Sequence, residues 1–362
     1  MTTLLHVVGA RPNFMKVAPV LAAGTRAGCR QVLVHTGQHY DAAMSDAFFR
    51  DLGLPAPDEN LEVGSGTHAQ QTARIMLAFE PALDRHRPDW VVVYGDVNST
   101  VACALVAAKK GVRIAHVEAG LRSGDRAMPE EVNRILTDQL ADLCLTPSRD
   151  GDRNLLAEGI PASRVRLVGN VMVDTLLRLR GAARARLVPE SLGLSDGDYA
   201  FVTLHRPSNV DEPATLGELL HALEDLGRRM PVIFAVHPRT RQRIGEFGLL
   251  PGNGAVRMVE PLGYLDALSL VDRAALVLTD SGGLQEETTV LGVPCITARP
   301  STERPVTVTE GTNRLVASRR ADIDAAVEQV ISARAAGSFQ PGRPEGWDGR
   351  AGERVIEALL AT

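Results

Sequence analysis

The chain has 362 residues and a net charge of −5, and 44% of its residues are hydrophobic but only 4% are aromatic. This length suits two domains of ordinary size, and an aliphatic core fits α/β layers better than a β-sandwich. Basic and acidic residues are intermixed without a long run of one sign, which argues against a nucleic-acid or membrane surface.

In the first half of the chain, short apolar runs alternate with helical patterns. The runs that predict buried strands cover residues 4–8, 31–35, 90–94, 113–117, 142–145 and 165–168. Polar or glycine-containing turns follow most of these runs, and helical patterns follow the turns. Such alternation predicts a parallel sheet with helices on both faces.

The same alternation restarts in the second half, after a polar stretch at residues 188–198 that we interpret as a linker. Here the predicted strands are residues 200–204, 232–236, 256–259 and 276–278. A loop at residues 342–352 then leads into a last predicted helix at residues 354–360. We therefore expect two doubly wound α/β halves, with a ligand in the cleft between them at the carboxyl edges of both sheets.

A glycine-containing turn connects the last of these strands to a helix, and it carries Gly282 and Gly283. A helix N-terminus presents unpaired N–H groups and the positive end of the helix dipole, which suits a phosphate. The alternative is an ordinary capped helix, with Asp280 or Ser281 as its cap. Glu287 favours the functional interpretation, because a carboxylate in the second turn can reach past a bound diphosphate to a ribose hydroxyl pair.

Charged side chains cluster after the ends of the predicted strands, where a parallel sheet presents its site. They are Arg11, Lys16, Asp96, Glu118, Glu130, Glu131, His205, His237 and Asp280. The groups that could neutralise a diphosphate are Arg11, Lys16, Arg304 and the Gly282–Gly283 turn. The groups that could move protons are Asp96, Glu118 and Glu130.

Each of these residues also has a structural alternative. Asp96 could cap the helix that begins near residue 98. Glu130 or Glu131 could complement a helix dipole, with Arg134 as a partner at helical spacing. His237 could be a core or cleft histidine without a chemical role. The site is favoured because so many of these residues fall at the same edge.

Several known motifs are missing from the sequence. No GxGxxG follows the first strand, so a nicotinamide cofactor is not expected. The sequence also has no Walker A motif, no GxSxG elbow and no HExxH, and its scattered histidines imply no metal. We expect neither a cofactor nor a metal ion.

The four cysteines are too widely spaced for a CxxC metal pair or a disulfide framework, which favours a reducing compartment. The chain starts directly in a strand, without a basic leader and without a run of about 18 apolar residues. A cytoplasmic protein is expected.

Taken together, the motifs resemble the non-hydrolysing UDP-N-acetylglucosamine 2-epimerases. The matching stretches are residues 9–16, 35–41, 95–96, 116–122, 129–134, 169–170, 205–206, 280–287 and 302–305. The resemblance implies a glycosyltransferase-B-like fold of two Rossmann-like domains, in which the last helix packs back on the first domain. The implied domains are residues 1–172 with 350–362, and residues 173–349.

The resemblance also implies an activity, namely the interconversion of UDP-N-acetylglucosamine and UDP-N-acetylmannosamine. It proceeds by anti elimination of UDP, a 2-acetamidoglucal intermediate and re-addition of UDP. The implied catalytic residues are Asp96, Glu118, Glu130 and His205. The implied substrate-binding residues are Arg11, Lys16, Ser281, Gly282, Gly283, Glu287 and Arg304. A cytoplasmic homodimer without a cofactor, serving polysaccharide biosynthesis, is the form that the resemblance implies.

Some alternatives stay open at this point. A sister group that shares the 35–41 motif acts on a UDP-diacetamido-uronic acid. There are three further alternatives: a glycosyltransferase of the same fold, a hydrolysing epimerase and an inactive binding module. The three carboxylates argue against the glycosyltransferase and against the binding module. Tyr40–Asp41 and Pro207–Ser208 stand where relatives carry regulatory motifs, so we expect no activation by substrate.

Overall fold

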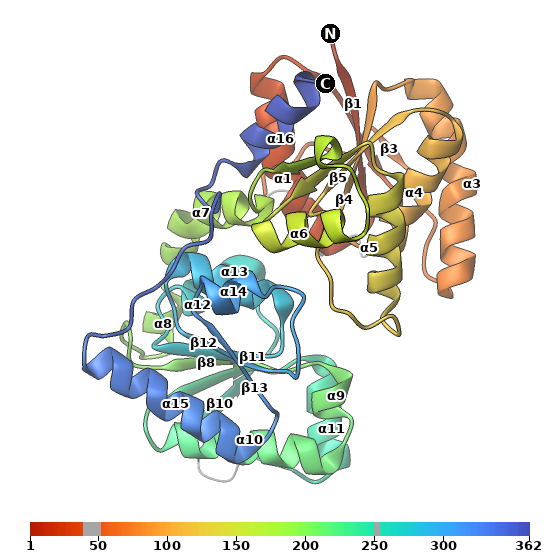
Figure 1. Ribbon diagram of the computed structural model, residues 1–362. Coiled ribbons are helices and arrows are strands. Elements are labelled where there is room, and N and C mark those ends of the chain that lie inside the picture. Colours follow the sequence, from red (N-terminus) through yellow and green to blue (C-terminus); the bar gives the residue numbers. More distant parts are fainter. Residues whose placement is uncertain (39–51, 250–253) are drawn as a thin grey trace. The chain divides into compact units, whose positions relative to one another are not determined.

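The computed structural model describes residues 1–38, 52–249 and 254–362 (Figure 1). Their contacts divide the chain into two compact units. Unit 1 comprises Met1–Arg178 and Glu345–Thr362, and unit 2 comprises Leu179–Pro344. The domain boundaries expected from the sequence, after residue 172 and before residue 350, stay predictions.

Unit 1 is built on a seven-stranded parallel sheet with the order β3-β2-β1-β4-β5-β6-β7. Its strands are β1 (Thr3–Val8), β2 (Arg30–His35), β3 (Glu59–Asn60), β4 (Trp90–Tyr94), β5 (Arg113–Val117), β6 (Leu143–Thr146) and β7 (Val165–Leu167). The central strands are apolar almost throughout, because helices cover both faces of a parallel sheet and leave neither face to water.

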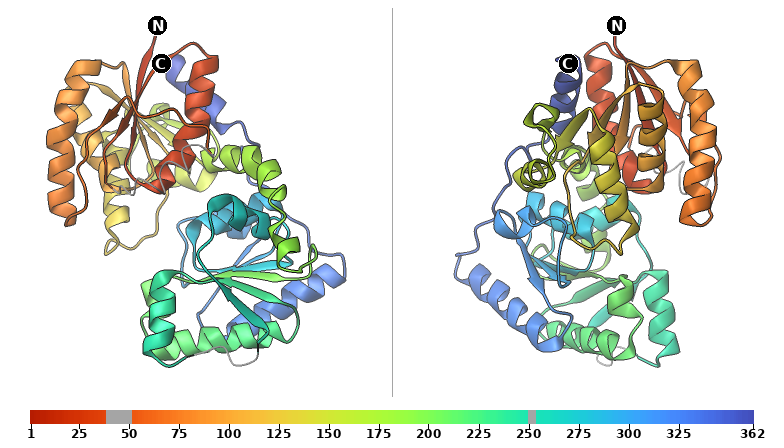
Figure 2. Two further views of the ribbon diagram at one scale, coloured as in Figure 1. Left: turned by 180° about the vertical axis from the view of Figure 1, so that it is seen from behind. Right: turned by 45° about the vertical axis from the view of Figure 1, so that its right-hand side comes forward.

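The helices of unit 1 lie on both faces of this sheet (Figure 2). They are α1 (Arg11–Arg26), α3 (His68–His86), α4 (Asn98–Lys109), α5 (Pro129–Leu140), α6 (Arg149–Ala157), the start of α7 (Val171–Arg184) and α16 (Ala351–Leu360). Helices α3, α4 and α5 follow one another side by side in one layer, and α1 lies beside α16.

The C-terminal helix α16 returns to unit 1 because its first turn fits closely against α1. A Cβ atom at Gly352 would lie 2.7 Å from the carbonyl oxygen of Pro19, so only glycine permits this approach. The N–H groups of Ala351 and Gly352 donate to the carboxylate of Asp174 in α7 at 3.1 and 2.8 Å. These bonds satisfy N–H groups at the helix N-terminus that have no partner within the helix.

Unit 2 has a six-stranded parallel sheet with the order β10-β9-β8-β11-β12-β13. Its strands are β8 (Ala200–Thr203), β9 (Val232–Ala235), β10 (Val256–Val259), β11 (Leu276–Thr279), β12 (Cys295–Ala298) and β13 (Asn313–Val316). Its helices are the end of α7, α8 (Val188–Ser191), α9 (Pro207–Val210), α10 (Pro213–Gly227), α11 (Pro238–Glu246), α12 (Tyr264–Val271), α13 (Gly282–Leu291), α14 (Val306–Thr309) and α15 (Arg320–Ala335). The predicted α/β class with two doubly wound parallel sheets is confirmed, although β3, β12 and β13 were not predicted.

The interpretation of residues 188–198 as a linker is wrong. This stretch begins with α8 and packs on the core of unit 2, where Leu194 is buried beside Tyr199. Val188 and Leu192 pack against the same cluster, one helical turn apart. The stretch looks polar in the sequence, but its apolar residues Val188, Leu192 and Leu194 lie on one side and cover this core.

In each sheet the direction of the strand order reverses between the first and the fourth strand of the unit. These strands are β1 and β4 in unit 1, and β8 and β11 in unit 2. Ligands of open α/β sheets bind outside the carboxyl ends of the strands at such switch points. The segments that leave these four strands therefore define where a site is expected. Within the described part of the chain, no helix is long and apolar enough to cross a membrane.

Candidate functional site

In unit 1, a buried asparagine ties the turn after β1 to the end of β4. The side-chain oxygen of Asn13 accepts the N–H groups of Gly9 and Ala10 at 3.1 and 3.0 Å, and its Nδ2 donates to the carbonyl oxygen of Tyr94 at 2.9 Å. This bridge spans the switch point of the sheet. Arg11 is the first residue of α1, and its side chain lies outside the described part.

Lys16 and Glu118 form a buried ion pair at this edge. The Nζ atom of Lys16 lies 2.8 Å from each carboxylate oxygen of Glu118, and the two residues are 6% and 5% exposed. Glu118 has a φ of +74°, a conformation that L-residues adopt only when their surroundings enforce it, and such strain often marks a functional position. A Cβ at Gly95 would lie 2.6 Å from the same Nζ, so glycine leaves room for the lysine.

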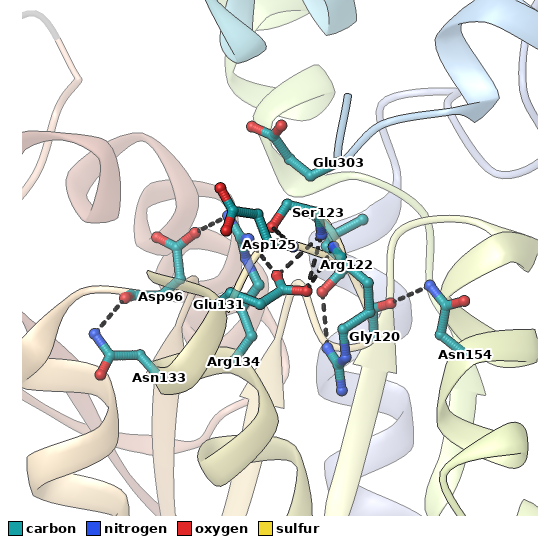
Figure 3. A network of polar contacts seen from close by, with 12 residues as sticks. Asp96, Gly120, Arg122, Ser123, Asp125, Glu131, Asn133, Arg134, Asn154 and Glu303 are labelled. Carbon is teal, nitrogen blue, oxygen red and sulfur yellow. Dashed lines mark hydrogen bonds and ion pairs between the residues drawn. The ribbon is translucent and has the colours of Figure 1, made fainter. Parts of the chain in front are cut away.

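Asp96 follows β4 and binds a guanidinium (Figure 3). One of its carboxylate oxygens lies 2.5 Å from Arg134 of α5, and its backbone oxygen accepts from Asn133 at 2.8 Å. The N-cap residue of α4 is Val97, and its side chain makes no capping hydrogen bond there. The alternative that Asp96 caps this helix is therefore wrong.

The neighbours Glu130 and Glu131 separate into two different roles. Glu131 is buried, binds Arg134 at 2.9 Å and accepts the N–H groups of Ser123 and Gly124 (Figure 3). Burial alone would raise the pKa of Glu131, but these backbone N–H groups and Arg134 hold the pKa below its usual value. The structural alternative thus holds for Glu131, whereas Glu130 is exposed.

A cavity of about 310 Å³ in unit 1 brings Asp96 and Glu130 together. The other polar side chains that line it are Gln38, Ser65, His68, Gln71, Asn98 and Asn133. Asn98 donates to Gln71 at 2.8 Å, and Ser99 donates through its N–H and hydroxyl groups to Gln38 at 3.1 and 2.7 Å. The amides are therefore fixed in orientation, and amide groups can bind sugar hydroxyl and acetamido groups.

The sequence interpretation missed these amides. Asn133 was the one with a usable signal, because it lies three residues after Glu130 and so on the same face of the helix. The others come from segments that only the fold brings together. His39, Tyr40 and Asp41, which belong to a motif of the resemblance, lie outside the described residues.

In unit 2, Asp280 and His205 bridge the switch point between β11 and β8. Asp280 is fully buried, and one of its oxygens lies 2.9 Å from Nδ1 of His205. It also accepts the N–H groups of His205 and Arg206 and the side-chain amide of Asn209. Burial would raise the pKa of Asp280, but His205 and these N–H groups hold the pKa below its usual value. The carboxylate thus fixes the ring orientation of a half-exposed histidine.

Helix α13 begins shortly after Asp280 in the chain. Ser281 is the N-cap residue of α13, as one alternative expected, although its side chain makes no capping bond; Asp280 is engaged with His205 and is not the cap. A Cβ at Gly282 would lie 3.0 Å from both Arg304 and Glu303, so glycine brings the helix end close to the guanidinium. The turn that was predicted from two glycines is present.

Arg304 belongs to a cluster of three guanidinium groups and two carboxylates. Arg304 binds Glu286 and Glu303 at 2.9 and 2.8 Å, and Arg299 binds Glu303 at 2.9 Å. Arg206 is the third cation, 3.8 Å from Glu303. Burial opposes ionisation of Glu303, but Arg304 and Arg299 lower its pKa to about 2. The cluster keeps a net positive charge beside a helix N-terminus, which suits an anion. Arg299 was missed by the sequence interpretation.

Glu287 and His237 lie nearby in unit 2. Burial raises the pKa of Glu287 to about 7; the hydroxyl of Tyr264 hydrogen-bonds to this carboxylate and opposes the rise, and Glu286 adds to it. His237 caps α11, where its Nδ1 accepts the N–H of Arg239 at 3.2 Å, and its ring centroid lies 5.7 Å from that of His205. His237 therefore has a structural function as a helix cap.

Similarity to known proteins identifies the family of this chain. Residues 22–360 match the family model described as UDP-N-acetylglucosamine 2-epimerase. The chain belongs to this epimerase family. A UDP-N-acetylglucosamine 2-epimerase of Methanocaldococcus jannaschii is 41% identical over 98% of this chain and 97% of its own. A UDP-2,3-diacetamido-2,3-dideoxy-D-glucuronate 2-epimerase of Pseudomonas aeruginosa is also 41% identical, over 98% of this chain and 99% of its own.

Solved structures of epimerases share the fold. The M. jannaschii enzyme in complex with UDP-GlcNAc and UDP has a TM-score of 0.87 at 39% identity, and each chain covers 100% of the other. The Neisseria meningitidis enzyme bound to UDP-GlcNAc has a TM-score of 0.89 at 28% identity and the same coverage. The fold of this epimerase family member is thus glycosyltransferase-B-like with two Rossmann-like domains, as the resemblance implied.

Proposed function

We propose that the protein is a non-hydrolysing 2-epimerase that interconverts UDP-N-acetylglucosamine and UDP-N-acetylmannosamine. The observation that carries the proposal is the set of carboxylates at the carboxyl edge of the first sheet. Asp96 and Glu130 line one cavity, and Glu118 follows the adjacent strand, paired with Lys16. Family membership and the names of the relatives support the same activity.

The chemistry explains why several carboxylates are needed. The C2 proton of a 2-acetamido sugar has no adjacent carbonyl carbon to stabilise an anion, and it becomes acidic only as the bond from C1 to UDP breaks. A carboxylate removes this proton while cations hold the departing diphosphate. A second carboxylate then delivers a proton to the other face of the glycal, and UDP re-adds. Two faces require two proton-transfer groups, and Asp96, Glu118 and Glu130 supply them.

Unit 2 supplies the groups that hold UDP. The N-terminus of α13, with Ser281, Gly282 and Gly283, and the Arg304 cluster bind the diphosphate, and Glu287 binds the ribose. Arg11 and Lys16 of unit 1 are the further substrate-binding residues that the resemblance implies. Asp280 engages Nδ1 of His205, which leaves Nε2 to contact a phosphate oxygen and assist the departure of UDP. We expect a homodimer in the cytoplasm.

The test is turnover in D₂O followed by proton NMR. UDP-N-acetylglucosamine should give the manno epimer with deuterium at C2, because the proton leaves to a group in exchange with solvent. An ¹⁸O label between C1 and the β-phosphorus should scramble into non-bridging positions, and small amounts of UDP and 2-acetamidoglucal should leak. A product that keeps its C2 hydrogen and its bridging label would contradict the mechanism, and free N-acetylmannosamine would show a hydrolysing enzyme instead.

A second candidate is the 2-epimerisation of a UDP-diacetamido-uronic acid. It is favoured by the P. aeruginosa relative, which is as similar to this chain as the archaeal N-acetylglucosamine enzyme. The two substrates differ at C3 and in the C6 carboxylate. Comparison of kcat/KM for both sugar nucleotides under identical conditions decides between them.

A further inference from the structure

His116 in β5 is a buried ring between two hydrogen-bond acceptors. Its side chain is fully buried, its Nε2 lies 2.8 Å from the carbonyl oxygen of Gly95, and its Nδ1 lies 2.6 Å from a carboxylate oxygen of Asp138 in α5. A carbonyl oxygen can only accept, so Nε2 carries a proton. The remaining question is whether the proton between His116 and Asp138 belongs to the ring or to the carboxyl group.

The surroundings of Asp138 assign this proton to the ring. The other oxygen of Asp138 accepts the N–H of Gly120 at 3.1 Å and lies 2.8 Å from the guanidinium of Arg122. Burial would raise the pKa of Asp138, but His116 and Arg122 hold the pKa below its usual value. The carboxyl group is therefore the acceptor, and the ring of His116 donates to it from Nδ1 and to the carbonyl group of Gly95 from Nε2.

The other groups around this pair are fixed charges and a neutral thiol. Glu158 at the end of α6 binds Arg122 at 2.7 and 2.6 Å, and Arg164 donates to the backbone oxygen of Asp138 at 3.4 Å. Cys144 in β6 donates to the same oxygen at 3.6 Å, and burial raises its thiol pKa to about 12, with Asp138 adding to the rise. Charged and polar groups that are themselves hydrogen-bonded therefore enclose the pair.

The two ends of the pair reach the two turns that carry carboxylates. Gly95 directly precedes Asp96, and Gly120 comes two residues after Glu118. Both glycines have positive φ angles, +62° and +82°, so each turn has a sharp backbone conformation that must be held in place. The ion pair binds the carbonyl group of one turn and the N–H group of the other.

We propose that the His116–Asp138 pair is a positioning device that holds Asp96 and Glu118 in register, because it joins the turn that carries one carboxylate to the turn that carries the other. Neither residue needs to touch the sugar nucleotide. The kinetic consequence rests on the proposed function, because it requires that Asp96 and Glu118 act in the epimerisation. The protonation state does not depend on that function and is tested separately.

The protonation state is tested by ¹⁵N NMR of the full-length protein labelled in its histidine rings. The spectrum of His116→Gln identifies the signals of His116. Both ring nitrogens of His116 should report as N–H donors at neutral pH, because one faces a carbonyl oxygen and the other a carboxylate oxygen. A ring nitrogen of His116 that is unprotonated at neutral pH overturns the assignment.

The positioning role is tested with Asp138→Asn, which keeps the shape of the side chain and removes its charge. We expect kcat to fall about 10- to 100-fold, as when outer partners that orient a site are removed, with KM and UDP affinity little changed. His116→Gln, which can still donate to Gly95, should retain more activity than His116→Phe. The control is Asp142→Asn, because the exposed Asp142 binds the N–H of Ile114 at the other end of the same strand.

The outcomes distinguish a failure of the proposed epimerase function from a failure of the positioning role of the His116–Asp138 pair. An inactive wild-type protein refutes the proposed function, and the NMR experiment still decides the ion pair. An active wild type with unchanged kcat in folded Asp138→Asn overturns the positioning role. If Asp138→Asn does not fold, His116→Gln and His116→Phe with equal, wild-type turnover overturn it in the same way.

Discussion

The carboxyl edges of the two sheets have the same topology and opposite chemistry. In unit 1 the switch point presents carboxylates, and cations support them: Arg134 binds Asp96, and Lys16 binds Glu118. In unit 2 the N-terminus of a helix and guanidinium groups gather, and carboxylates support them, as Glu303 does for Arg304.

This comparison shows that the doubly wound fold determines where a site lies but not what the site does. The same crossing of strands can gather negative groups for proton transfer or positive groups for anion binding. Buried charges of either kind need partners of the other sign, because burial of an unpaired charge is too costly. The supporting ions therefore differ in sign between the units, while the backbone scaffold is the same.

The largest expected effect concerns the carboxylates of unit 1. Asp96→Asn, Glu118→Gln and Glu130→Gln should each lose epimerisation by roughly 10²- to 10⁴-fold, the contribution of a positioned acid or base. Binding of UDP should persist, because the proposed anion site is in unit 2. Turnover and calorimetric titration with UDP measure the two effects. Near-normal turnover in any of the three removes that residue from proton transfer.

The neighbouring glutamates sharpen this result. Glu131→Gln should lower the free energy of unfolding by about 1–3 kcal/mol, because the buried carboxylate of Glu131 accepts two backbone N–H groups and binds Arg134. Glu130→Gln should leave the stability unchanged, because Glu130 is exposed. Denaturant unfolding of both variants measures the difference. Equal stability of the two would show that the buried network contributes little.

The next effect concerns two cations proposed to bind UDP, Arg304 of unit 2 and Arg11 of unit 1. Arg304→Ala should weaken UDP binding about 10- to 100-fold, the loss of a charge-assisted hydrogen bond, and Arg11→Ala should weaken it through the same kind of contact. Arg229→Ala is the control, because Arg229 pairs with Glu328 on the surface of unit 2. If calorimetry finds wild-type UDP affinity in Arg304→Ala, the proposal that the carboxyl edge of the sheet in unit 2 binds an anion through Arg304 is contradicted.

Glu287 gives a pH-dependent prediction. Its folded-state pKa of about 7 lies above the ordinary value of 4.5, so the folded state holds the proton more tightly than the unfolded state does. The folded state therefore loses stability as the pH rises from 4.5 through about 7. Glu287→Gln should therefore be more stable than the wild type at pH 8, by at most about 3 kcal/mol, and the gain should vanish toward acidic pH.

Thermal unfolding at several pH values measures this gain, with the exposed Glu310→Gln as the control. UDP should raise the melting temperature of Glu287→Gln less than that of the wild type, because the variant lacks the carboxylate for the ribose. A stability difference that does not change with pH would show that Glu287 ionises normally in the folded protein.

The smallest expected effect is on the shape of the rate curve. We expect hyperbolic kinetics, and a reverse reaction that starts from pure UDP-N-acetylmannosamine without added gluco substrate. The reason is the expectation from the sequence resemblance that Pro207–Ser208, and Tyr40–Asp41 outside the described residues, stand in place of regulatory motifs. A reverse reaction that stays silent until a trace of the gluco compound is added would contradict this prediction.

The sequence by itself determined most of the scaffold and the location of the site. Apolar runs of strand length and the turns that follow them are local signals, so the central strands and the glycine turn at Gly282 could be predicted. Carboxylates directly after strands, such as Asp96 and Glu118, could be predicted as well, because parallel strands bring their carboxyl ends to one edge.

Only the tertiary structure decided which charges support which. Lys16 and Glu118 are 102 residues apart in the chain, and their contact depends on the order in which the strands lie in the sheet. The same holds for His116 and Asp138, and for the distinction between Glu130 and Glu131, which have the same chemistry in the sequence and opposite exposure in the fold. Local patterns fix secondary structure, but the environment of a charged side chain is set by distant segments, and this environment separates a reactive group from a supporting one.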